Sequence, residues 1–131
     1  MPRMTKAGWI GWVMTILAVL PFAFGSVMKL MQSPQVVQGF GHLGWPKSMI
    51  LTVGILELTS VVLYLIPRVS VLGAIVLTGF LGGAIATHLR IGEPVVMHIV
   101  LGLLIWGGLF LREPRLREIL PLRKANPAPV A

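Results

Sequence analysis

The sequence contains no cysteine and only four acidic residues in 131. Without thiols there is no disulfide exchange, no thiolate nucleophile and no cysteine ligand for an iron–sulfur cluster. Any redox chemistry must therefore belong to a bound cofactor. Charged residues make up 11% of the chain and hydrophobic residues 56%. This composition is too apolar for a soluble domain of this size, and it predicts an integral membrane protein built as one domain.

Four apolar runs are each long enough, or nearly so, to cross a hydrocarbon core, which takes about 20 helical residues. The predicted spans are residues 9–31, 48–66, 69–87 and 95–111. We therefore predict an all-α fold, a four-helix up-down bundle over residues 1–112 with a long first extracytoplasmic loop. Residues 113–131 form a basic cytoplasmic tail that is partly interfacial or disordered. A signal peptide ending near Gly25 is the alternative for the first run.

The basic residues predict the orientation. Eight of the eleven lysines and arginines lie on the side of the two termini, and three lie on the other side. By the positive-inside rule both termini are cytoplasmic, in a multi-pass protein of the cytoplasmic (inner) membrane. The +7 net charge indicates lipid rather than nucleic acid, because the cations sit just outside the apolar runs, at headgroup depth. The tail residues expected to bind anionic lipids are Arg112, Arg115, Arg117, Arg123 and Lys124.

Glu57 is the one acid inside an apolar run. A carboxylate at this depth costs about 3 kcal/mol unless it is paired, protonated or hydrated. Counted along ideal helices, Glu57 lies about 14 Å below the outer end of its span and His98 about 6 Å below, with Lys29 and His88 at the outer lip. The polar residues therefore predict a pocket open to the outside and closed on the cytoplasmic side. A direct Lys29–Glu57 pair would need a bend at Pro21 or a bridging water.

Each of these residues also has a purely structural interpretation. Glu57 can be a protonated, hydrogen-bonded packing residue, and Lys29 can extend to the headgroups. His88 can be interfacial, and His98 can make an interhelical hydrogen bond. Small residues from Gly79 to Gly83 indicate close helix packing, with a dimer face as the alternative. The candidate ligand-binding residues are Lys29, Trp45, Glu57, Tyr64, His88 and His98.

Metal sites find little support in the pattern. A carboxylate-bridged metal centre would need a second glutamate and a Glu-x-x-His spacing, and both are missing. Bis-histidine ligation of haem by His88 and His98 is a minor alternative. We therefore assign no metal and no definite cofactor, and we keep quinone as the candidate ligand.

Several short motifs, in this order and spacing, resemble the DoxX-like family of small four-span bacterial membrane proteins. They are Lys29-Leu30, Leu43-Gly44-Trp45-Pro46, Gly54-Ile55-Leu56-Glu57-Leu58, Ile66-Pro67-Arg68 and Gly83-Ala84-Ile85-Ala86-Thr87-His88-Leu89. The family takes its name from a subunit of an archaeal terminal quinol oxidase and thiosulfate:quinone oxidoreductase. The resemblance implies a four-helix bundle in the cytoplasmic membrane and suggests a quinone-linked role. On the pattern of the family, the resemblance implies that Lys29, Glu57 and His88 are the polar positions of the site.

Three functions are consistent with these features. The first is a non-catalytic subunit or binding module for a small amphipathic molecule such as a quinone, in a membrane oxidoreductase complex or as a homo-oligomer. The second is a small membrane enzyme that uses Glu57 as an acid or base. The third is a structural helix-packing partner.

Overall fold

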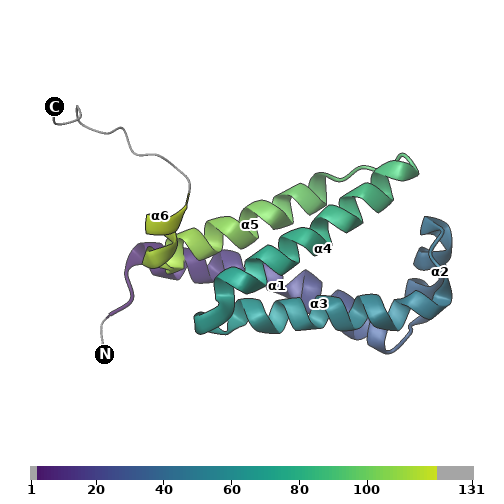
Figure 1. Ribbon diagram of the computed structural model, residues 1–131, viewed down its shortest axis with the longest axis horizontal. Coiled ribbons are helices and arrows are strands. Elements are labelled where there is room, and N and C mark those ends of the chain that lie inside the picture. The colour runs from purple at the N-terminus through teal and green to yellow at the C-terminus, as the bar shows by residue number, and fades with distance from the viewer. Residues whose placement is uncertain (1–2, 121–131) are drawn as a thin grey trace.

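The computed structural model describes residues 3–120, and all the regular secondary structure in that range is helical, with no strand (Figure 1). Four long helices form the bundle, and two short helices lie at its ends. The long helices are α1 (Lys6–Leu30), α3 (Ile50–Leu65), α4 (Ser70–Arg90) and α5 (Val96–Arg112). The short ones are α2 (Pro34–Leu43) and α6 (Pro114–Ile119). The predicted lipid contacts of Arg123 and Lys124 fall outside the described residues.

The four long helices pack in a ring, and each contacts two neighbours. The contacting pairs are α1–α3, α3–α4, α4–α5 and α5–α1. Consecutive helices run in opposite directions, as the predicted up-down bundle requires (Figure 1). Three of them, α1, α3 with its preceding turn, and α4, are long and apolar enough to cross a membrane, whereas α5 is apolar but only 17 residues long.

The bundle has two different ends. One end, called here the α2 end, carries α2 and the turn between α4 and α5. The other, called the terminal end, carries α6, the start of α1 and the link Pro67–Val69 between α3 and α4 (Figure 1). The link is a single 3₁₀ turn, so α4 must return directly beside α3. At the start of the basic tail, Leu116 of α6 is 1% exposed and packs against the core.

Local signals fix the boundaries at the α2 end. Ser33 caps α2, accepting a hydrogen bond from the backbone N–H of Val36. Gly44 ends α2 in the left-handed region, at φ 80°, which favours glycine because it has no Cβ. The end of α4 is Arg90, three residues beyond the expected Thr87, which places His88 on the helix instead of in the following turn. Helix α5 begins at Val96, one residue after the predicted start of the fourth span.

The terminal half of the bundle is tightly packed. Tyr64, Leu77, Ile105 and Leu109 are fully buried there. A Cβ added to Gly73 would overlap the backbone of Tyr64, so the α3 and α4 backbones are in contact at this point. Because glycine allows this approach, Gly73 fixes the position at which the two helices cross.

The expected close packing at Gly79 and Gly83 is wrong within this chain. Both residues are exposed, and a Cβ added to either would have no neighbour within 4 Å. The spacing of these small residues predicts a helix face that another helix can approach closely, but it does not predict whether another helix lies there. Here α3 and α4 have already diverged from their crossing at Gly73 before this point is reached (Figure 1).

Candidate ligand pocket

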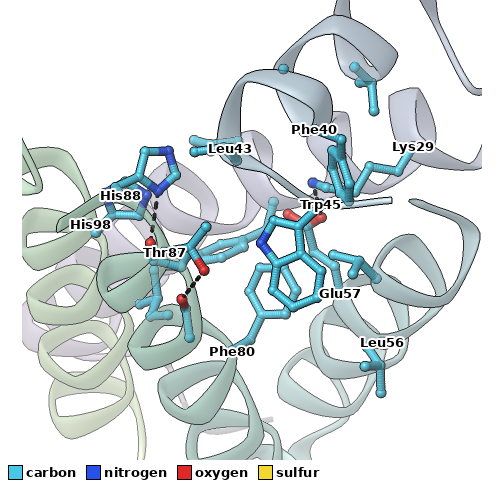
Figure 2. Close-up of a pocket in the computed structure, with 18 of the residues that line it drawn as sticks. Lys29, Phe40, Leu43, Trp45, Leu56, Glu57, Phe80, Thr87, His88 and His98 are labelled. Atoms are coloured by element: carbon cyan, nitrogen blue, oxygen red, sulfur yellow. Dashed lines mark hydrogen bonds and ion pairs between the residues drawn. The ribbon is translucent and has the colours of Figure 1, made fainter. Parts of the chain in front are cut away.

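A cavity of about 520 Å³ lies at the α2 end of the bundle. Its walls come from all four long helices and from α2, and most of the lining side chains are apolar (Figure 2). The polar groups on its wall are few: Lys29, Trp45, Glu57, Thr87, His88 and His98. Five of the six residues predicted for the site therefore line one cavity.

Lys29 and Glu57 form a direct ion pair on this wall. Lys29 Nζ lies 2.5 Å from Glu57 Oε2, and the two side chains are only 17% and 5% exposed. Gly25 and Gly54 make room for the pair, because a Cβ on Gly25 would lie 3.2 Å from Glu57 Oε1 and a Cβ on Gly54 would lie 2.8 Å from Lys29 Cβ. The carboxylate therefore has a charged partner in the protein interior.

Lys29 and Glu57 contact each other directly, so the expected bridging water is not needed. The expected bend at Pro21, which lies inside α1, stays a prediction. Side chains on a helix incline toward its N-terminus. Because α1 and α3 are antiparallel, the Lys29 side chain inclines toward the terminal end and the Glu57 side chain toward the α2 end. Lys29 also starts level with Gly54, one turn from Glu57. These two effects bring the two charged groups closer together than a count of residues along ideal helices predicts.

Two histidines form a second polar group in the cavity wall. The rings of His88 on α4 and His98 on α5 lie 4.6 Å apart between centroids, tilted by 49° (Figure 2). His88 Nδ1 is 2.8 Å from the carbonyl oxygen of Ala84, to which it donates. His98 Nδ1 is buried and has no hydrogen-bond partner among residues 3–120. It therefore has a hydrogen bond left to make.

The two rings lie against each other, and this arrangement differs from two axial ligands on opposite sides of a haem iron. Within residues 3–120, no group of three or more histidine, cysteine, aspartate or glutamate side chains lies close enough to hold a metal ion.

Helix α2 covers the cavity at the α2 end. Phe40 of α2 points inward and is 9% exposed. Two contacts join α2 to the end of α4 and the turn that follows it. His42 Nε2 lies 2.6 Å from Glu93 Oε1, and Arg90 donates a hydrogen bond from Nη2 to the carbonyl oxygen of Leu43. These contacts, here called the roof contacts, were not predicted, because they join residues about 50 positions apart that only the bundle brings together.

Tyr64 lies away from the cavity, in the packed terminal half. Its hydroxyl donates to the carbonyl oxygen of Ile105 at 2.6 Å and lies 3.4 Å from Thr15 Oγ1. The side chain is fully buried and does not line the cavity. Tyr64 therefore joins α3 to α5 in this structure, and its hydroxyl is already hydrogen-bonded.

Arg112 makes contacts that the sequence did not indicate. Its guanidinium donates to Thr15 Oγ1 at 3.0 Å and to the carbonyl oxygen of Tyr64 at 3.1 Å. It also lies over the ring of Trp12, 4.4 Å from the centroid. Arg112 thus ties the end of α5 to α1 and α3. Contact between the tail arginines and lipid stays a prediction.

Apolar antiparallel helices that enclose a small polar cluster define a multi-pass α-helical membrane protein. The model of the DoxX-like family matches residues 13–108, and the chain belongs to this family. The match includes the whole cavity wall and excludes α6. Comparisons with curated proteins and with solved structures gave no significant match.

Proposed function

We propose that this member of the DoxX-like family is a non-catalytic membrane subunit whose cavity binds a small amphipathic molecule, with a quinone as the candidate. The observation that carries the proposal is a lysine–glutamate pair in the wall of a mostly apolar cavity. Ligand sites combine apolar walls with a few placed polar groups, typically in about 300–1,000 Å³. A volume of about 520 Å³ is in this range.

The chemistry of the wall supports a planar ligand with hydrogen-bond acceptors. A lysine ammonium has three N–H donors. One is directed at Glu57, and a second points at the carbonyl oxygen of Gly25, 3.5 Å away. The third is available to a ligand carbonyl. His98 Nδ1 is a further polar group without a partner in the described chain, and aromatic rings from Phe40, Trp45 and Phe80 line the space between.

A quinone matches these requirements because its two carbonyl oxygens lie at opposite edges of a flat ring. With no cysteine in the chain, such a ligand would supply the redox-active group. The family resemblance suggests a membrane oxidoreductase complex as the setting.

The proposal predicts that protein purified from membranes retains quinone and that Lys29→Met retains about tenfold less, because the donor to the ligand carbonyl is lost. Solvent extraction followed by chromatography measures the quinone per protein. Glu118→Gln is the control, because Glu118 is an exposed acid on α6 outside the cavity. Wild-type protein without quinone, or equal retention in the Lys29→Met variant, would contradict the proposal.

We also propose that the α2 end faces the outside of the cytoplasmic membrane, with both termini inside. The support is the excess of basic residues at the terminal end. Because the chain has no cysteine, single cysteines can be introduced at Gln38 on α2 and Glu118 on α6, both exposed. An impermeant maleimide added to intact cells should label only the Gln38→Cys protein. Labelling of only the Glu118→Cys protein would reverse the orientation.

A further inference from the structure

The cavity is bounded at both ends along the bundle axis, and α2 covers the end at which the sequence predicted an opening to the outside. Toward the terminal end, Phe22 and Leu81 form the floor and are 4% and 5% exposed. The Phe22 ring also packs edge-on against Phe80, 6.3 Å between centroids. At the other end, α2 forms a roof that the roof contacts join to the end of α4 and to Glu93 in the turn after it.

The side between α3 and α4 is different. Leu56 of α3 lines the cavity although it is 54% exposed. On the facing side, Gly79 and Gly83 of α4 line the cavity, are exposed, and have open space where a Cβ would stand. The cavity wall is therefore interrupted between these two helices. The gap begins beyond the crossing at Gly73, and Figure 1 shows the helices diverging from there toward the α2 end.

This gap lies within the length of two membrane-spanning helices. Gly79 is eleven residues from the end of α4 at Arg90, or about 16 Å along the axis. The gap therefore lies at the depth of hydrocarbon, and its residues, Leu56, Gly79 and Gly83, carry no polar side chain. The charged groups, Lys29 and Glu57, line the same cavity and are far less exposed than Leu56.

We propose that the cavity opens sideways into the bilayer between α3 and α4, and that its ligand is a chain-bearing lipid-soluble molecule that enters through this gap. The polar head reaches the Lys29–Glu57 pair, and the hydrocarbon chain stays between Leu56 and the glycine face of α4. This inference rests on the proposed function for the identity of the head, whereas the gap itself follows from the helix geometry.

The gap is tested without any ligand by spin labelling. The measured quantity is the relaxation rate of a nitroxide attached to the Gly83→Cys protein. Oxygen, which concentrates in lipid, should increase this rate more than a water-soluble nickel chelate does. Gly82→Cys is the lipid-facing reference, since Gly82 is exposed and open but does not line the cavity. Gln38→Cys on α2 is the aqueous reference. A Gly83→Cys label with the accessibility of the Gln38→Cys label would overturn the lateral opening.

The chain is tested by binding in phosphatidylcholine nanodiscs, with decylubiquinone compared with ubiquinone-0, the same ring without the chain. Gly83→Leu should weaken decylubiquinone binding about tenfold and ubiquinone-0 binding less, because leucine occupies the place of the chain. Gly82→Leu, an equal change on the same helix, should bind both quinones as wild type does. Unchanged decylubiquinone binding by the Gly83→Leu protein would overturn the proposed chain position.

The same measurements distinguish the quinone assignment from the lateral opening. If wild-type protein binds neither quinone while the Gly83→Cys label is lipid-accessible, the quinone assignment is wrong and the lateral opening stands. The double variant Arg90→Ala with Glu93→Ala removes the side chains that make the roof contacts. It should leave the rate of decylubiquinone uptake unchanged, and a several-fold faster uptake would show entry under α2 instead.

Discussion

Gly73→Ala is expected to destabilise the protein by about 3 kcal/mol or more, because overpacking at a backbone contact cannot be relieved by a side-chain rotation. The added methyl group would overlap backbone atoms of Tyr64 and Leu63. To accept it, α4 would have to move away from α3, which would disturb the buried Tyr64 hydroxyl and its hydrogen bond to Ile105. Titration with SDS, followed by circular dichroism of the helices, measures the loss.

Gly79→Ala is the matched control for this substitution. It makes the same chemical change on the same helix, but at a position with open space around the new Cβ. Alanine has the higher helix propensity, so this variant should be as stable as wild type or more stable by about 1 kcal/mol. Equal destabilisation by both variants would mean that α3 and α4 do not cross at Gly73.

Lys29→Leu is expected to cost about 3–5 kcal/mol, the range found when one partner of a buried ion pair is removed. The remaining Glu57 side chain is 5% exposed, so the carboxylate would lose its charged partner without gaining water. The double variant Lys29→Leu with Glu57→Leu should be more stable than Lys29→Leu alone, because no charge is then left in the interior. The same SDS titration gives the coupling free energy between the two sites.

Lys6→Leu provides the control for losing a lysine, since Lys6 is exposed in the first turn of α1, far from the cavity. Its stability should lie within about 0.5 kcal/mol of wild type. A Lys29→Leu protein as stable as the Lys6→Leu protein would show that Glu57 does not depend on the lysine.

The architecture could be predicted from the sequence, because apolar runs of membrane length identify helices and a two-residue link such as Pro67-Arg68 forces neighbours to be antiparallel. The end of the bundle that holds the polar cluster could also be predicted from residue depth along each span. Lys29, Glu57, His88 and His98 were placed in this way, and all line the cavity.

Features that depend on side-chain direction or on the angle between helices could not be predicted. The direct ion pair follows from the opposite inclination of two antiparallel side chains, which a count of depth leaves out. The exposure of Gly79 and Gly83 follows from the divergence of α3 and α4, on which a small-residue pattern carries no information. Tyr64 was assigned to the site by its helix face, but its hydroxyl bonds to a neighbouring backbone carbonyl.

The contact at Gly73 acts as a fixed pivot for the two helices that flank the gap. Thr87 on the cavity wall lies fourteen residues further along α4, about 21 Å from the pivot. One degree of rotation therefore moves it by about 0.4 Å. A membrane of different thickness changes helix tilt, so under the proposed lateral opening a change of tilt about Gly73 would change the width of the gap.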